Sequence, residues 1–329
     1  NDASVWVSNG SKQFVGRANT EILELNSVVA AESSELEVVQ GGATVLLFDE
    51  GSSKADIIDP ATSTVLDSVP MPTVAPRLFL AGDNVVVADG NGRVWIVPAS
   101  EFTHFDPESP ETLSLGADAV YAMGTDGMLA AYSRDAGLVY RIDVARTADV
   151  VETHPLVLGG ATSQLSITWV GSSWAVLDAT PRTVVIDGTT IDLSTLIAAG
   201  DQPRLQEPTP TGSTVLLAYS GGLLSLSAAG GAPTQVVEGM SGTPAAPVVA
   251  DGCTYAAWTG GTAWRSCRGE TPVTMSLSSV PIGAARLGFA RNDDRIVLND
   301  PRGGNSWAVQ SSGQLIDNWD ELERTQKQQ

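Results

Sequence analysis

The sequence has few of the residues from which metal centres and proton-transfer sites are usually built. Its 329 residues include only two cysteines and two histidines. The histidines, His104 and His154, fit neither an HxH nor an HExxH spacing, and we expect both in solvated loops. Two cysteines alone cannot complete a structural zinc site. We therefore expect no metal, no other cofactor and no serine–histidine–aspartate triad.

Positive charge and long apolar runs are also scarce. Eighteen basic residues face 38 acidic ones, which gives a net charge of −20. Nucleic acids and anionic membrane surfaces bind proteins through basic patches, so neither is an expected partner. No stretch reaches the roughly 18 apolar residues of a membrane-spanning helix. The chain begins at Asn1 without Met, and we expect a mature product or an excised fragment.

One short pattern recurs along the whole chain. Its clearest copy is TVLLFD, an apolar run that ends at Asp49, followed by a Gly/Ser turn and a second run, ADIID, from Ala55. Apolar runs bounded by turn residues predict β-hairpins. The first strands of eight such copies begin 40 to 45 residues apart, at Ser4, Thr44, Asn84, Met128, Ser173, Thr214, Thr254 and Arg295.

Most copies also have a strand before the hairpin and another after it. Four strands in this period are typical of a β-propeller blade, whose sheet faces are covered by neighbouring blades. We predict an all-β β-propeller of four-stranded antiparallel blades, with eight blades in one domain over residues 1–323 and a polar tail over 324–329. Seven blades are the alternative. The copy at Ser4 has no room for an inner strand, so its blade borrows one or keeps three.

The two cysteines fall at opposite ends of one predicted hairpin. Pairing Trp258 with Thr262 across the turn at Thr259 places Cys253 opposite Cys267. Directly opposed residues are close enough for a disulfide, and disulfides persist in oxidising compartments. We predict this bridge; two free thiols are the alternative.

Two resemblances concern single segments. Ser133 to Tyr140, SRDAGLVY, resembles the Asp-box of sialidases, which is a structural hairpin in that family. Only one imperfect copy occurs, and the family's catalytic residues cannot be assigned, so the likeness implies no activity. Ile57 to Pro72, IIDPATSTVLDSVPMP, resembles the repeat of YVTN-type propellers in microbial surface proteins.

A wider resemblance covers essentially the whole chain. The runs from Val5 to Asn19 and from Arg295 to Leu322 are similar to the N-terminal propeller of large actinobacterial surface proteins. In that group, fibronectin type III or immunoglobulin-like modules follow the propeller. The resemblance implies an extracellular, cell-surface domain that is anchored through segments outside this chain.

These features predict a non-enzymatic interaction or scaffold module of the adhesion type. We expect a monomeric domain of a larger polypeptide, with a protein or a cell-wall glycan as its partner. The alternative is a carbohydrate-active enzyme, a lyase or a glycosidase, with carboxylates at the mouth of the central channel. A propeller fold is compatible with both.

The turns that join the second and third strands of the blades lie on one face of a propeller. Five of them carry a basic residue in this strongly acidic chain, and Arg93 lies at the edge of a sixth. Such turns are solvated and carry charge of either sign, so the pattern is open to a structural reading. As candidate binding residues for an acidic ligand we take Lys12, Lys54, Arg134, Arg182 and Arg302.

Overall fold

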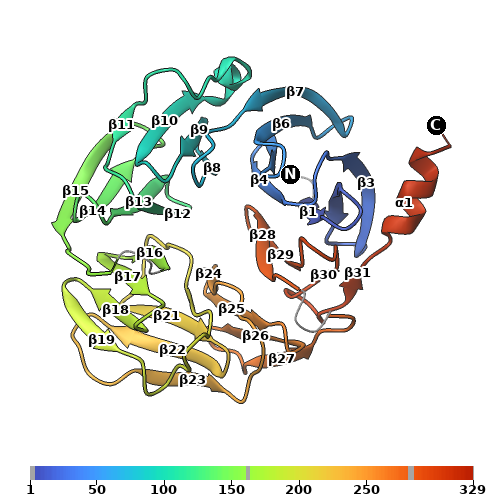
Figure 1. The fold of residues 1–329 in the computed structure, drawn as a ribbon. Coiled ribbons are helices and arrows are strands. Elements are labelled where there is room, and N and C mark those ends of the chain that lie inside the picture. Colours follow the sequence, from blue (N-terminus) through green and yellow to red (C-terminus); the bar gives the residue numbers. More distant parts are fainter. Residues whose placement is uncertain (1–3, 161–163, 281–284, 329) are drawn as a thin grey trace. The chain divides into compact units, whose positions relative to one another are not determined.

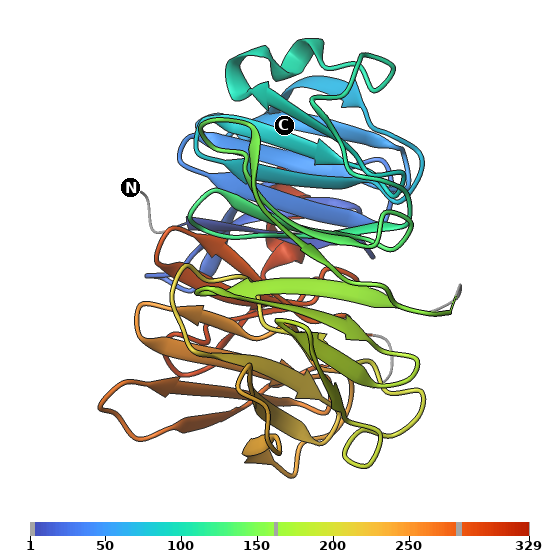
Figure 2. The ribbon, with the colours of Figure 1, turned by 90° about the vertical axis from the view of Figure 1, so that its left-hand side faces the viewer.

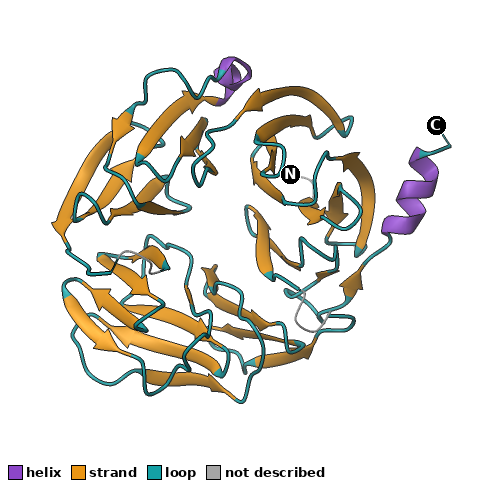
Figure 3. Ribbon diagram, viewed as in Figure 1, coloured by secondary structure: helices purple, strands orange, loops and turns teal. Residues whose placement is uncertain are grey.

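The computed structural model describes residues 4–160, 164–280 and 285–328, and most of them lie in β-strands or in the turns between them (Figure 3). The strands form eight separate antiparallel sheets, the eight blades of a β-propeller, as the repeat predicts. Seven sheets have four strands, and the first blade has three. Within the described residues the helices are the 3₁₀-helix η1 (Ala99–His104) and α1 (Trp319–Gln326).

The chain divides into two compact units, and the first comprises residues 1–71 and 250–329. Its strands are, for blade 1, β1 (Ser4–Asn9), β2 (Phe14–Asn19) and β3 (Glu24–Ala30); for blade 2, β4 (Leu36–Gly41), β5 (Thr44–Asp49), β6 (Lys54–Asp59) and β7 (Thr64–Pro70); for blade 7, β25 (Cys253–Trp258), β26 (Thr262–Cys267) and β27 (Val273–Ser276); and for blade 8, β28 (Gly288–Asn292), β29 (Arg295–Asn299), β30 (Ser306–Trp307) and β31 (Leu315–Ile316). The first strand of blade 7, β24 (Val248–Ala250), contains the boundary between the units.

The second unit comprises residues 72–249. Its strands are, for blade 3, β8 (Arg77–Ala81), β9 (Asn84–Ala88), β10 (Arg93–Pro98) and β11 (Leu113–Ser114); for blade 4, β12 (Ala119–Met123), β13 (Met128–Ser133), β14 (Leu138–Asp143) and β15 (Asp149–Pro155); for blade 5, β16 (Leu165–Val170), β17 (Ser173–Asp178), β18 (Thr183–Ile186) and β19 (Thr189–Asp192); and for blade 6, β20 (Arg204–Leu205), β21 (Thr214–Tyr219), β22 (Gly222–Ser227) and β23 (Thr234–Glu238). The expectation that both histidines lie in loops is wrong, because His154 belongs to β15 and His104 is the last residue of η1.

Apolar layers between successive blades form the core of each unit. In the first unit, Trp6 and Val15 of blade 1 pack with Leu47 and Ile58 of blade 2. In the second unit, equivalent layers join blades 3 and 4, blades 4 and 5, and blades 5 and 6. Figure 2 shows the strands of these blades as ribbons. Strands β13 and β17 are covered on both faces by neighbouring blades, which is why their sequences are almost continuously apolar rather than alternating.

The first and last blades of the chain are neighbours within the first unit. Val7 of β1 shares an apolar layer with Val297 of β29, Ile316 of β31 and Trp319 of α1. The turns of the two blades also meet, since the Ser11 amide donates to the Arg302 carbonyl at 2.9 Å. Strand β1 contacts both β4 of blade 2 and β28 of blade 8, and these three strands lie side by side (Figure 1).

The predicted disulfide is present in blade 7. Strands β25 and β26 pair with Trp258 opposite Thr262 and Cys253 opposite Cys267, and the two cysteines are bonded. Both residue pairs agree with the sequence prediction, because the position of the turn fixes every pair in an antiparallel hairpin.

Candidate functional site: the central hairpin turns

The candidate site is the set of turns that join the two middle strands of each blade, which we name the central hairpin turns. In seven of the eight repeats, the residue that ends the first of these strands or directly follows it has a polar side chain and is buried. These seven residues are Asn9, Asp49, Asp89, Ser133, Asp178, Thr259 and Asp300. In the remaining repeat, that of blade 6, the equivalent residue is Tyr219, which is partly buried. The repeated strand thus ends in a polar anchor.

Most of these anchors hold the turn that follows them through hydrogen bonds to its backbone. Asp89 accepts from the amides of Asn91 and Arg93, each at 3.0 Å. Asp49 accepts from the Ser52 amide at 3.2 Å and, in the preceding connection, from the Glu32 amide at 3.0 Å. Asp and Asn side chains commonly close turns in this way, and buried polar groups require such partners. The central hairpin turns are therefore held to a defined backbone shape.

In the first unit, two of the predicted cations are bound to carboxylates. The Lys12 ammonium contacts Asp320 at 2.6 Å and Glu323 at 2.9 Å, both on α1. Hydrogen bonds to Asp320 and then to Glu323 raise the pKa of Lys12. Lys54 contacts Glu32 at 2.8 Å; burial lowers its pKa, but the attraction of Glu32 and Asp56 outweighs burial, and the net shift is upward.

The third cation of this unit, Arg302, is exposed. Its backbone amide donates to Asp300 Oδ1 at 3.1 Å. The structure brings the turns of Lys12 and Arg302 together through the backbone bond from Ser11.

In the second unit, the predicted cations are half-buried and contact neighbouring segments. Arg134 pairs with Asp118 at 3.2 Å. Arg182 has a left-handed backbone with φ 60° and donates to the carbonyl oxygens of Ser194 and Ile197 at 3.3 and 2.8 Å. Arg93 pairs with Asp89 at 2.7 Å and lies over the Trp95 ring. These side chains brace the turns as well as carrying charge.

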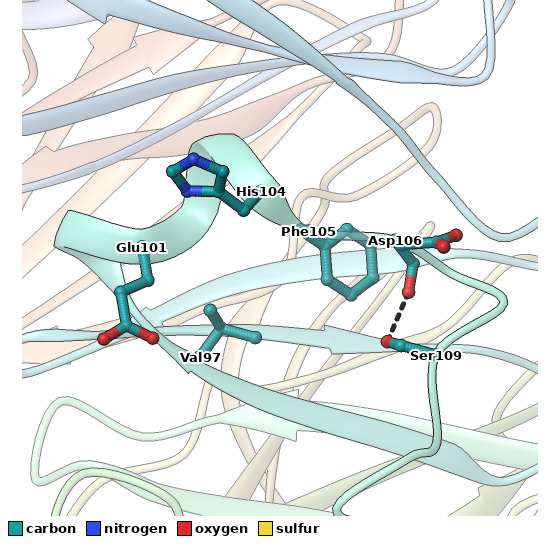
Figure 4. Close-up of a pocket in the computed structure, with 6 residues that line it drawn as sticks. All are labelled: Val97, Glu101, His104, Phe105, Asp106 and Ser109. Atoms are coloured by element: carbon teal, nitrogen blue, oxygen red, sulfur yellow. Dashed lines mark hydrogen bonds between the residues drawn. The ribbon is translucent and has the colours of Figure 1, made fainter.

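A shallow pocket of about 290 Å³ lies beside η1 in blade 3 (Figure 4). Its lining residues are Val97, Glu101, His104, Phe105, Asp106 and Ser109. Phe105 is held by edge contact with Trp95 and by stacking on Phe102. Among the residues that the structure describes, no group of three or more His, Cys, Asp or Glu side chains could hold a metal ion.

A second pocket, of about 480 Å³, lies in the first unit. Its lining residues are Trp6, Gln40, Gly42, Ala43, Val45, Pro60, Asn292 and Asp293. Sequence reasoning did not identify this pocket, since its residues come from blades 1, 2 and 8 and share no local motif. The polar anchors were a detectable signal, because they recur at one position of the repeat.

Comparisons with known proteins support the fold. No protein-family model and no curated protein matches the chain. Among solved structures it is similar to BamB from Moraxella catarrhalis, with 12% identity over 92% of this chain and 90% of that one and a TM-score of 0.56. It is also similar to the computationally designed Ika8 protein, with 13% identity, coverage of 92% and 95%, and a TM-score of 0.61. For virginiamycin B lyase from Staphylococcus aureus the values are 13%, 82% and 91%, and 0.53.

At these identities the likeness concerns the β-propeller fold alone. The disulfide suggests an extracellular environment. No helix within the described ranges has the length and apolar character needed to span a bilayer.

Proposed function

We propose that this chain is a non-enzymatic extracellular interaction module, a scaffold of the adhesion type within a larger cell-surface protein. Its partner is an acidic protein or an anionic cell-wall glycan, bound by the face that carries the central hairpin turns. The contact set is the five cations Lys12, Lys54, Arg134, Arg182 and Arg302.

The observation that carries this proposal is that the buried carboxylates bind neighbouring groups of the fold itself. The buried acidic residues of the described chain are Asp49, Asp56, Asp89, Asp143, Asp178 and Asp300. Each is engaged locally: Asp143, for example, accepts from the Arg146 amide at 3.1 Å, and Asp178 accepts from the Thr180 amide at 3.3 Å. Carboxylates that accept hydrogen bonds from nearby backbone amides make the turns rigid. Rigid turns on a folded framework are suited to binding a partner.

Electrostatics favours an acidic partner for this face. The rest of the chain is strongly negative, so even partly compensated cations make the hairpin face less repulsive toward an anion. Arg302 carries most weight because its side chain is exposed. Lys54, Arg134 and Arg182 are partly covered, and each makes its own turn less negative.

The test is binding to isolated bacterial cell walls at low ionic strength with the variant Arg302→Glu. Reversing Lys54 or Arg134 would also break contacts within the fold, whereas Arg302 is exposed. We expect severalfold weaker binding, and weaker binding of the parent as salt rises. The matched control is Arg268→Glu, an exposed arginine in the turn between the third and fourth strands of blade 7. Equal binding by both variants and the parent would refute this face assignment.

A further inference from the structure

Within the described residues the first blade has no inner strand, and side chains from the adjacent blades cover the edge of β1 that such a strand would pair with. Gln40 of β4 accepts from the Trp6 amide at 3.0 Å and donates to the Ser4 carbonyl at 3.4 Å. Asn292 of β28 also donates to the Ser4 carbonyl, at 2.8 Å. Because these amides already occupy the edge, a peptide strand would have to displace them.

The 480 Å³ pocket opens beside this patched edge, entirely within the first unit. Its floor includes Trp6, Val45 and Asn292, all buried, and Gln40, which is partly buried. Its rim includes the exposed residues Gly42, Ala43 and Asp293 from the β4–β5 and β28–β29 turns. Small-molecule sites commonly have about 300–1,000 Å³ and combine apolar walls with a few converging polar groups.

Asn292 gives the pocket an unsatisfied acceptor. Its side chain is 7% exposed, its Nδ2 is committed to Ser4, and its Oδ1 has no partner among the described residues. A buried carbonyl oxygen without a donor is costly, so a ligand that donates a hydrogen bond there gains more than an exposed contact would give.

We propose that this pocket binds a small organic molecule with a primary ammonium group. Asn292 Oδ1 requires a donor, the Asp293 carboxylate at the rim favours a positive charge, and the Trp6 side chain adds an apolar wall. An ammonium group supplies three donors and a cationic charge at once. A neutral hydroxyl compound of the same shape supplies a hydrogen-bond donor but no positive charge.

The experiment measures binding by calorimetry of the whole chain with three amines, ethanolamine, glucosamine and phenethylamine. Each is compared with its neutral counterpart, ethylene glycol, glucose and phenethyl alcohol. We expect at least one amine to bind and its counterpart to bind more weakly. Failure of all three amines, or equal binding by the neutral partner, overturns the proposal.

Two variants locate the site. Asp293→Asn keeps the shape and tolerates the φ of 52°, and it should weaken amine binding about fivefold, as expected for an exposed charge pair. Asp294→Asn is the control, since Asp294 is exposed next to Asp293 but does not line the pocket. Ala43→Trp should block the entrance and abolish binding without touching the core. Unchanged amine binding by Ala43→Trp would also overturn the proposal. This pocket uses none of the proposed binding cations, so the two proposals fail independently.

Discussion

The side chain of Asn299 makes the two hydrogen bonds with the Ser8 backbone that a neighbouring strand would make. Asn299 Oδ1 accepts from the Ser8 amide at 3.1 Å, and Asn299 Nδ2 donates to the Ser8 carbonyl at 3.1 Å. Both residues are buried, and the bond joins the last blade to the first. One side-chain amide therefore makes the hydrogen bonds that one residue of an inner strand would make to Ser8.

The first prediction concerns this contact. Asn299→Leu leaves the Ser8 amide and carbonyl unpaired in a buried place, and each such group costs about 1–3 kcal/mol. We expect the free energy of unfolding, measured by urea denaturation, to fall by about 2–6 kcal/mol. The control Asn91→Leu alters an exposed turn residue and should change it by less than about 0.5 kcal/mol. A similar small effect for Asn299→Leu would show that the edge tolerates water.

The second prediction concerns the disulfide of blade 7. The bridge closes a loop with a sequence separation of 14, inside a hairpin already held by strand pairing. Chain entropy accounts for about 3 kcal/mol of stabilisation from a loop of this length, so we expect Cys253→Ala with Cys267→Ala to lower the free energy of unfolding by about that amount or less. Ellman titration of denatured parent should detect two thiols only after reduction. Two thiols without reductant would contradict the bridge.

The sequence predicts those parts of the fold that depend on local, repeated signals. Eight strand pairs at one period give the blade number, and the turn at Thr259 gives the register that pairs Cys253 with Cys267. The contacts of Gln40 and Asn299 with β1 could not be predicted, because each joins two different blades, and those of Asn299 join the last blade to the first. A lone amide residue carries no signal of the edge that it will cover.

The same reasoning applies to the candidate site. The positions of the basic turn residues follow from the repeat, but their partners do not. The repeat predicts that Lys12 faces a ligand, whereas its ammonium is shared by two carboxylates of α1, a helix for which the strand-and-turn repeat carries no signal. The binding measurement with Arg302→Glu tests whether this face binds an anion.

Helix α1 and the residue before it, Asn318, are attached to blades 1 and 8 by three sets of contacts. Trp319 is buried and donates from its Nε1 to the Gly304 carbonyl at 2.7 Å. Asn318 exchanges two hydrogen bonds with the Leu25 backbone, at 2.8 and 3.0 Å. Lys12 then binds the first and second turns of the helix through Asp320 and Glu323. Only the last of these contacts depends on charge.

The third prediction is that α1 detaches at both ends of the pH range. Hydrogen bonds from Lys327 and then Lys12 lower the pKa of Glu323 to about 2, against an ordinary value of 4.5. A depressed carboxyl pKa stabilises the folded form above the ordinary value, and this contribution disappears as pH falls from 4.5 toward 2. The pKa of Lys12 is raised above 10.5, so its contribution is complete below that pH and disappears as pH rises through the folded pKa.

Amide hydrogen exchange in α1 should therefore be slowest between about pH 5 and 10, after correction for intrinsic exchange rates. Lys12→Gln should accelerate exchange in the helix within this range and flatten its pH dependence, because it removes the charged contact between the helix and blade 1. Lys327→Gln is the matched control: Lys327 pairs with Glu323 inside the helix, so its loss shifts the carboxyl pKa upward but leaves the Lys12 contact. Protection that is the same in Lys12→Gln and the parent would mean that Trp319 and Asn318 hold the helix without help from charge.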